Sequence, residues 1–237
     1  MKTLVISDMH FPFQDDKALE LVDKFIKKEK PDNIVINGDL VDCYSLSSFA
    51  KDPRLGATLS KEVAMAREYL AHLNKISKAK KYYVFGNHSI RMNRYLIKQA
   101  PELLDFLDLQ GLLETDGWEI INCSNVENYV KIDEWYIGHF DKVAKHSAMT
   151  AKNIVADRGV NIVQGHTHRL GAYYVKFLDR TLRGLEGGCL CTLTPTYMAS
   201  PNWQQGFVLI ENKNAYPIEI INHSFTWNGK TYTSDKS

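Results

Sequence analysis

The chain has 237 residues and a formal net charge of +1 at pH 7. Its 44% hydrophobic and 24% charged residues are typical of a globular protein, and we expect one domain over residues 1–237 at this length. The balanced charge provides no global basic field of the kind that holds long duplex nucleic acid. No apolar run reaches the length of a membrane span, and the first residues lack a secretory pattern, so we expect a cytoplasmic protein without a membrane partner.

Four cysteines, Cys43, Cys123, Cys189 and Cys191, show no framework spacing. A chain of this size does not need disulfides to stabilise its core. Cys189 and Cys191 could bind a soft metal as a pair. Alternate positions of an apolar stretch favour the other interpretation, in which both thiols are small buried hydrophobes on one face of a strand.

The first half of the chain alternates strand and helix patterns. Apolar β-rich runs predict strands at residues 2–7, 33–37 and 81–85, and apolar residues at helical spacing predict helices at 15–30 and 60–77. The first two strands and the helix between them form a β-α-β unit, whose strands should be parallel.

A helical segment is expected at about residues 89–110, and Pro101 should divide it into two shorter helices. After it, short strands are expected at 118–121, 129–132, 134–138 and 161–164, with a helix at 147–157. The last third consists mostly of strands, at 173–178, 180–185, 206–210 and 216–220. This order of elements predicts a layered α/β sandwich.

Polar residues follow five of these apolar strands at the point where each strand ends. They are Asp8 and His10, Asp39, Asn87 and His88, His139, and His166 and His168. Because the carboxyl ends of parallel strands face one crevice, these groups can converge there. Alternate residues of an extended segment share a face, so Asp8 with His10, and His166 with His168, could each point at one centre. A glycine precedes the ligand in four of these turns, which permits a tight bend and a close approach.

The donor set mixes carboxylate or amide oxygens with imidazoles, which suits Mn, Fe, Zn or Ni better than Ca or Mg. The ligands are too many for one ion, and a carboxylate can bridge two. Two-metal sites with ions roughly 3.5 to 4 Å apart serve in-line displacement at phosphorus. We therefore expect two divalent ions, with Mn favoured. His72, His146 and His223 belong to none of these turns, so we assign them surface or core roles.

At these residues the chain resembles the calcineurin-like metallophosphoesterase superfamily, whose pattern is D-x-H, G-D-x-x-D, G-N-H, a later H and G-H-x-H. The motifs occur in that order between residues 8 and 168. The resemblance implies a four-layer α/β/β/α sandwich and a phosphoester hydrolase that attacks phosphorus with a metal-bridging hydroxide. It implies that Asp8, His10 and His168 bind one metal, that Asn87, His139 and His166 bind the other, and that Asp39 bridges both.

The resemblance also implies that His88 is a catalytic acid or a phosphate contact. Family members often carry Asp or Glu after G-N-H, where this chain has Ser89, and a carboxylate there could orient the imidazole and raise its pKa. Asp42 could replace that support, or it could cap a helix or turn. Arg91 and Arg94 could recognise phosphate at the rim, or they could be solvated surface charges.

The sequence leaves the substrate open. A phosphodiester, such as a nucleotide or a nucleic-acid end, is favoured over a phosphomonoester on a small molecule or protein, because we find no second cluster for a phosphoprotein. A group of aromatic and polar residues could stack a base beside the metals or could cover the sheet edge: Tyr197, Asn202, Trp203, Gln204 and Gln205. A non-catalytic scaffold of the same fold is disfavoured, since every ligand position is filled. The oligomeric state is not predicted.

Overall fold

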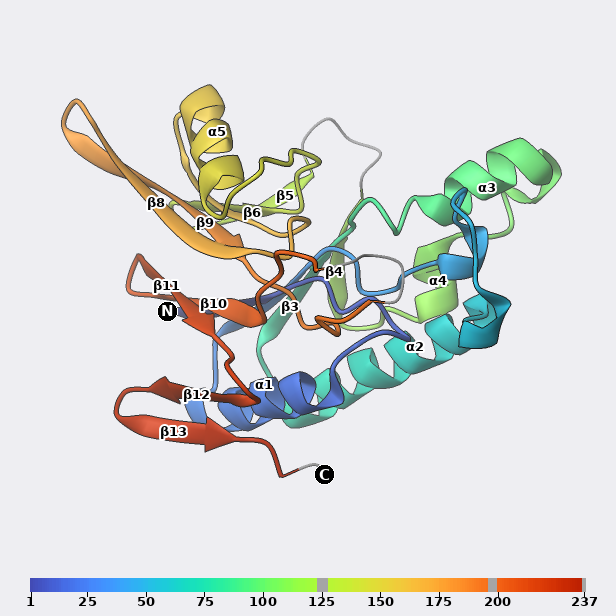
Figure 1. Cartoon of the computed structure of the whole chain (residues 1–237), viewed down its shortest axis with the longest axis horizontal. Helices are drawn as coiled ribbons and strands as arrows, with labels where there is room; N and C mark the ends of the chain where they lie inside the picture. Colours follow the sequence, from blue (N-terminus) through green and yellow to red (C-terminus); the bar gives the residue numbers. More distant parts are fainter. Residues whose placement is uncertain (123–127, 196–199, 236–237) are drawn as a thin grey trace.

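The computed structural model describes residues 1–122, 128–195 and 200–235, so Cys123 and Tyr197 lie outside the described residues. Two β-sheets pack face to face, and helices cover the outer side of each sheet (Figure 1). The predicted four-layer α/β/β/α sandwich is therefore confirmed. A single domain over the whole length stays a prediction.

The first sheet has the strand order β11-β10-β1-β2-β3-β4. Its strands are β1 (Lys2–Ile6), β2 (Asn33–Asn37), β3 (Lys80–Val84), β4 (Trp118–Ile121), β10 (Gly206–Glu211) and β11 (Asn214–Glu219). The strands β1 to β4 run parallel, as predicted for β1 and β2, while β10 and β11 are antiparallel to their neighbours. Every residue of β2 is buried, as expected for a parallel strand covered on both faces.

The second sheet has the strand order β5-β6-β7-β9-β8. Its strands are β5 (Tyr129–Ile132), β6 (Trp135–Gly138), β7 (Asn161–Gln164), β8 (Leu170–Phe177) and β9 (Arg180–Gly187). The central strands β6, β7 and β9 are parallel, and β5 and β8 are antiparallel edges. The carboxyl ends of β6 and β7 therefore lie at one end of this sheet.

Helices α1 (Asp16–Glu29) and α2 (Leu59–Ile76) cover the first sheet, and α5 (Met149–Arg158) covers the second (Figure 1). The α1 helix begins where the Asp15 carboxylate accepts hydrogen bonds from two backbone N–H groups, and it ends at Lys30 in the left-handed conformation.

The hydrophobic core lies in three layers between these elements. One cluster fills the space between α1, α2 and the first sheet, a second lies between the sheets, and a third lies under α5. Along β1, Leu4 and Ile6 join the helix-side cluster while Val5 joins the inter-sheet cluster. This alternation is the two-residue period of a strand, and it holds β1 rigidly between two packed layers.

Shorter elements surround this core. The segment at 89–110 contains α3 (Arg91–Gln99), which ends before Pro101 as predicted, and the short helix η3 (Pro101–Leu103). Further short helices are η1 (Tyr44–Leu46), η2 (Pro53–Leu55) and α4 (Leu109–Leu113). A hairpin of β12 (Ser224–Trp227) and β13 (Lys230–Thr233) was not predicted, and its Phe225 and Tyr232 rings pack against Phe25 of α1. Within the described ranges, no helix has the length and apolar character needed to cross a bilayer.

Candidate metal centre

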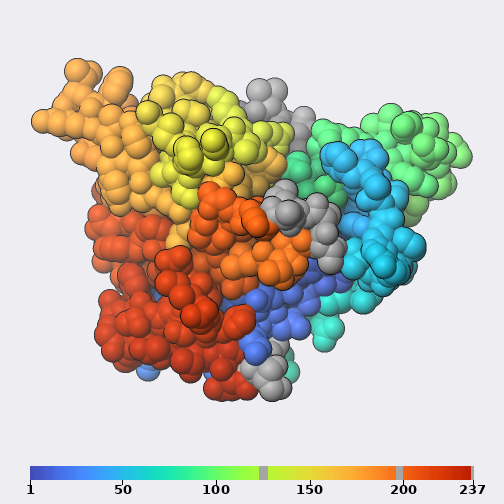
Figure 2. Space-filling view, viewed as in Figure 1, coloured from blue at the N-terminus to red at the C-terminus, as the bar shows by residue number. Residues whose placement is uncertain are grey.

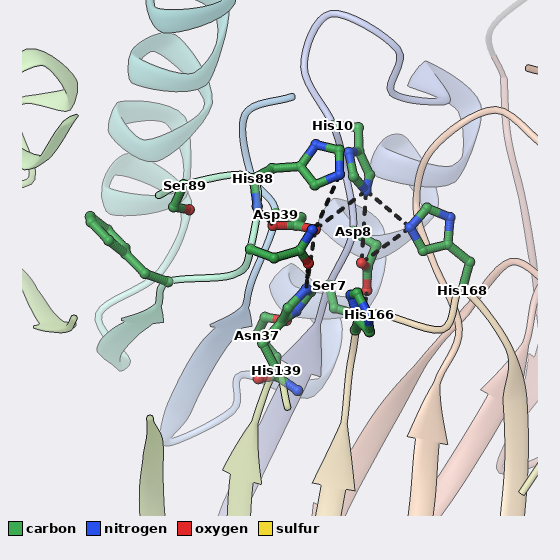
Figure 3. A network of polar contacts seen from close by, with 12 residues as sticks. Ser7, Asp8, His10, Asn37, Asp39, His88, Ser89, His139, His166 and His168 are labelled. Carbon is green, nitrogen blue, oxygen red and sulfur yellow. Dashed lines mark hydrogen bonds and ion pairs between the residues drawn. The ribbon is translucent and has the colours of Figure 1, made fainter. Parts of the chain in front are cut away.

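The five strand ends singled out in the sequence meet at one end of the sandwich, where both sheets open onto the same point (Figure 3). β1, β2 and β3 arrive from the first sheet, and β6 and β7 arrive from the second. The loops after these strands bring together all seven predicted ligands and the predicted catalytic histidine: Asp8, His10, Asp39, Asn87, His88, His139, His166 and His168.

Asp8, His10 and His168 form the first group of potential ligands, whose ligand atoms all lie within 4.8 Å of one another. The Nε2 atoms of His10 and His168 are 3.0 Å apart, and Asp8 Oδ1 is 3.2 Å from His168 Nε2. His10 Nδ1 donates to Asp42 Oδ2 over 3.1 Å, which turns Nε2 toward the group. Asp8 Oδ1 is buried and has no hydrogen-bond partner among the described residues. A cation at this point would satisfy all three side chains.

Asp39, His139 and His166 form the second group. His139 Nδ1 donates to the Asn37 carbonyl over 2.9 Å, so His139 Nε2 faces two acceptors, Asp39 Oδ2 and Asn87 Oδ1, each at 3.1 Å. Burial lowers the pKa of His139, but the neighbouring carboxylates outweigh it and raise that pKa to about 9. Three electron-rich atoms at hydrogen-bond distance require a positive charge between them, either a proton or a metal ion.

The pairing expected from alternate residues is wrong for His166 and His168. His166 belongs to the second group and His168 to the first, so they point at adjacent centres rather than at one. Asp8 and His10 do converge, but not along an extended segment, since β1 ends at Ile6 and both residues have left-handed backbones with φ of 55° and 52°. Two further groups of potential ligands overlap these, namely His10, Asp39 and His88, and His168, Cys189 and Cys191, so the assignment of each ligand to one ion stays a prediction.

Backbone strain is concentrated in this cluster. Five of the seven predicted ligands have φ between 43° and 72°: Asp8, His10, Asp39, His166 and His168. Non-glycine residues rarely adopt this conformation, and each instance costs on the order of 1 to 3 kcal/mol. The surrounding core must hold these loops in place, which is typical of a preorganised site.

Two polar residues that the motif spacing does not indicate hold the ligand loops. The buried Glu186 carboxylate accepts from Thr167 Oγ1 at 3.3 Å and from two backbone N–H groups at the start of α5 at 3.1 and 3.3 Å. It thereby ties the His166–His168 loop to a helix. The Asn37 side chain donates to the carbonyls of Gly138 and Val163, which links the first sheet to the second directly under the centre.

His88 lies beside both groups and contacts Asp42 and Arg91. Its Nδ1 donates to the Asp42 carbonyl at 2.9 Å, and its Nε2 is 2.9 Å from Arg91 Nη2. Because a guanidinium can only donate, Nε2 accepts this bond in the observed arrangement. Proton donation by His88 would therefore require Arg91 to move away. Ser89 offers no support, since its buried hydroxyl pairs with the Tyr83 hydroxyl at 3.1 Å.

The Asp42 carboxylate sits between His10, His88 and Arg91. Besides the His10 bond, Asp42 Oδ2 is 3.4 Å from His88 Nδ1 and Asp42 Oδ1 accepts from Arg91 Nη1 at 3.2 Å. The alternative role as a cap is not observed, because η1 is preceded by Cys43 and has no side-chain cap. Asp42 thus occupies the place of a supporting carboxylate, while a part in catalysis stays a prediction.

Arg91 and Arg94 differ sharply in position, which leads to a paired prediction. The Arg91 side chain is 19% exposed and bonded to Asp42 and His88, whereas Arg94 is exposed on the next turn of α3. We expect Arg91→Ala to lower kcat/KM for phosphoester hydrolysis by about 10- to 100-fold, because it frees both partners. We expect Arg94→Ala to stay within about twofold of the parent. If steady-state assays gave the same kcat/KM for Arg91→Ala and Arg94→Ala, the contacts of Arg91 with Asp42 and His88 would not matter for hydrolysis.

Glu62 of α2 lies behind the loop that carries Asp42. Its side chain is fully buried, and Oε1 accepts from the Tyr44 backbone N–H at 3.0 Å while Oε2 has no hydrogen-bond partner among the described residues. Burial, followed by the nearby Asp42 carboxylate, raises the pKa of Glu62 from 4.5 to about 7. The protonated form is therefore the stable one below neutral pH.

Glu62→Gln should stabilise the protein at alkaline pH. The folded state keeps the Glu62 proton up to about pH 7 and the unfolded chain releases it near 4.5, so the parent loses stability as pH rises through this window. The amide does not titrate and keeps the acceptor for Tyr44. Urea unfolding should show a gain of roughly 3 kcal/mol over the parent at pH 8 and almost none at pH 4. Glu68→Gln, at an exposed position, is the control, and its free energy of unfolding should follow that of the parent at every pH. The same result for Glu62→Gln would contradict the raised pKa of Glu62.

Cys189 and Cys191 are buried, but they lie beyond the end of β9 and not in a strand. With His168 they form a further group of potential ligands, so the choice between a soft-metal pair and small buried hydrophobes stays open. Cys191 Sγ is 3.7 Å from His168 Nδ1, the ring nitrogen that faces away from the first group. Contact with Cys189 and burial raise the pKa of Cys191 well above its usual value, so it is a neutral thiol. This thiol is a contact of the centre that spacing alone did not indicate.

Among the aromatic and polar residues expected beside the metals or at the sheet edge, Trp203 reaches the centre. Its ring lies 4.3 Å from the His168 ring, measured between centroids. Gln205 donates to Asp15 and the Cys191 carbonyl, and Gln204 accepts from the Leu170 N–H, so both have structural contacts. The remaining histidines lie away from the centre. His72 pairs with Asp23, His223 pairs with Asp15, and His146 is exposed.

Comparisons with known proteins agree with this geometry. The Gene 54 proteins of Mycobacterium phages D29 and L5 are 29% and 28% identical over 252 and 253 aligned residues, and each alignment covers 98% of both proteins. Vps29 of Chaetomium thermophilum, in complex with a cyclic peptide, shares the fold with a TM-score of 0.50 and 13% identity, over 100% of this chain and 98% of that one. A family model described as calcineurin-like phosphoesterase matches residues 1–170, a range that includes both groups of ligands. The chain therefore belongs to the calcineurin-like phosphoesterase family.

Proposed function

We propose that the protein hydrolyses phosphodiesters with two divalent metal ions, Mn being favoured over Fe, Zn or Ni. Asp8, His10 and His168 would bind one ion, and Asn87, His139 and His166 the other. The observation that carries this proposal is the position of Asp39 between the groups. Its Oδ2 is 3.1 Å from His139 Nε2 on one side and 3.9 Å from His10 Nε2 on the other. One carboxylate therefore faces both centres.

The residues present fit such a pair of ions. The donors are imidazole nitrogens, carboxylates and one amide oxygen, and Asp8 Oδ1 is buried without a hydrogen-bond partner in the described ranges. When bound, the ions would activate a water nucleophile and neutralise charge on the phosphoryl oxygens. The protein would hold the ligands in place through Asn37, Asp42 and Glu186, so little reorganisation is needed.

The charge near the centre favours a diester. Among the residues that the structure describes, Arg91 is the guanidinium that contacts His88 and Asp42, and Asp42 already neutralises it at 3.2 Å. A phosphomonoester dianion carries one more negative charge than a diester, and it would find little additional positive charge here. A nucleotide or a nucleic-acid end is the diester class that we favour. A phosphomonoesterase would use the same centre and is the alternative.

The test compares a diester with a monoester. Metal-stripped protein would be refilled with Mn, Zn, Fe or Ni separately and assayed with bis-p-nitrophenyl phosphate and p-nitrophenyl phosphate. We expect metal-dependent turnover with a higher kcat/KM for the diester. A higher value for the monoester would replace the diesterase by a phosphatase, and no turnover with any ion would contradict hydrolysis and return attention to a scaffold.

A further inference from the structure

A small cavity of about 80 Å³ opens directly beside the metal centre. It shares His10 and Asp42 with the centre, and the rest of its wall is largely apolar, including Phe13, Leu55, Cys191 and Trp203. We call it the aromatic pocket. Its walls come from the N-terminal segment, the segment near residue 55 and the segment after β9. These three regions, coloured blue, light blue and orange, all reach the face shown in Figure 2.

The two aromatic walls are fixed by contacts with the loops that carry the site. Phe13 meets the Tyr44 ring edge to face at 5.5 Å, and its backbone carbonyl accepts from the Thr192 N–H at 2.9 Å. Trp203 lies against the His168 ring at 4.3 Å. The pocket is therefore continuous with the first group of ligands, and a phosphoester held there would direct its organic group into it.

Size and charge restrict what the pocket can accept. Pockets for drug-sized ligands measure roughly 300 to 1,000 Å³, so this one has room for about one ring. The Asp42 carboxylate forms part of the wall, and no lysine or arginine is found among the described residues that line it. Asp42 is already paired with Arg91 and His10, so the wall offers no uncompensated positive charge to a second phosphate or a carboxylate, whereas a flat neutral ring can pack against the indole and phenyl rings.

We propose that the aromatic pocket binds a planar aromatic ring of the substrate's organic group, and so selects aryl or nucleoside phosphoesters over alkyl ones. This inference rests on the proposed function, because it presumes that the phosphoryl group lies at the metal centre. The ring could be attached directly to the ester oxygen, as in an aryl ester, or through a sugar, as in a nucleotide. The chemistry of recognition is the same.

Calorimetric binding to the Mn-loaded protein separates the pocket from the metals. The ligands would be inorganic phosphate, methyl phosphate, phenyl phosphate and thymidine 5′-monophosphate. We expect at least one of the two aromatic ligands to bind about 5- to 150-fold more tightly than methyl phosphate, as stacking on an aromatic side chain provides. Preference for phenyl phosphate would indicate an aryl ester, and preference for the nucleotide would indicate a base.

Two variants test the walls. Trp203→Ala should remove most of the advantage of the aromatic ligand over methyl phosphate. Because Trp203 also touches His168, Leu55→Glu provides an independent test, since it adds a negative charge to the far wall. Phe106→Ala, at a side chain that is 81% exposed, is the matched control.

The possible outcomes distinguish this inference from the proposed function. Equal binding of methyl and aromatic phosphates to the parent, or equal losses for all ligands in both pocket variants, would overturn the aromatic pocket while hydrolysis could still stand. If the Mn-loaded protein neither binds inorganic phosphate nor hydrolyses a phosphoester, the proposed function fails and the inference fails with it.

Discussion

Asp39→Asn should reduce the turnover of a phosphodiester by on the order of 1,000-fold or more, which is the largest effect of a single isosteric change that we expect. The variant keeps the shape of the side chain. Its amide oxygen can still accept the hydrogen bond that the His88 backbone N–H donates to Asp39 Oδ1 at 2.9 Å. It loses the negative charge that faces both groups of ligands. Burial alone would raise the pKa of Asp39, but the neighbouring imidazoles outweigh it and hold this pKa well below its usual range. The site therefore strongly favours the negative charge of Asp39.

The assay is kcat for bis-p-nitrophenyl phosphate with Mn, together with circular dichroism to confirm folding. Asp133→Asn is the matched control, because Asp133 is exposed in the turn between β5 and β6 and has a left-handed φ of 52° that asparagine tolerates. The control should keep full activity. A folded Asp39→Asn protein with undiminished turnover would refute the bridging role.

Gly86→Ala should inactivate the protein almost as completely, although it adds one methyl group. A Cβ at Gly86 would overlap Asp39 Oδ1 and would lie 2.8 Å from the Asp39 backbone nitrogen, so rotation of the Asp39 side chain alone cannot relieve the clash. The loop after β2 would have to shift away from the centre. We expect a loss of at least about 100-fold in kcat/KM, and roughly 1 to 3 kcal/mol of stability from overpacking.

Gly187→Ala provides the control for that prediction. Gly187 also lies near the centre, but a Cβ there would be 3.4 Å from the Gln164 carbonyl and 3.6 Å from Ser7 Oγ, which is ordinary contact. The control should retain activity and stability in the same assay and in urea unfolding. If Gly86→Ala were as active as Gly187→Ala, the close packing of the ligand loops would not be essential.

The glycines show how far the sequence could predict the site. A glycine before the ligand in four of the five turns was expected to allow a tight bend, and Gly38 indeed has φ of +91°. The structure adds a second reason for three of the four glycines, since each of these leaves space for a ligand from another motif, whereas Gly138 lies against the Asn128 carbonyl and the Phe140 ring. Gly38 makes room for His139, Gly86 for Asp39, and Gly165 for both His139 and Asp8. Such clearances depend on how the two sheets pack, so they cannot be read from spacing.

Periodicity and motif order predicted most of the fold, because strands with two buried faces and amphipathic helices have strong local patterns. The β12–β13 hairpin was missed although Asn228-Gly229, a favoured hairpin turn, lies between its strands. The left-handed backbones of five ligands and the contacts of Cys191 and Glu186 could not be predicted. They arise where the tertiary structure overrides local preference.

The most direct test of two metal ions is their number per chain. Metal-stripped protein would be titrated with Mn and Zn by calorimetry, and the metal content of the dialysed complex would be measured. We predict two ions for the parent and one for His139→Ala, which removes a ligand of the second group and leaves Asp8, His10 and His168 intact. A single ion in the parent, or two ions in the variant, would contradict a binuclear centre built from these residues.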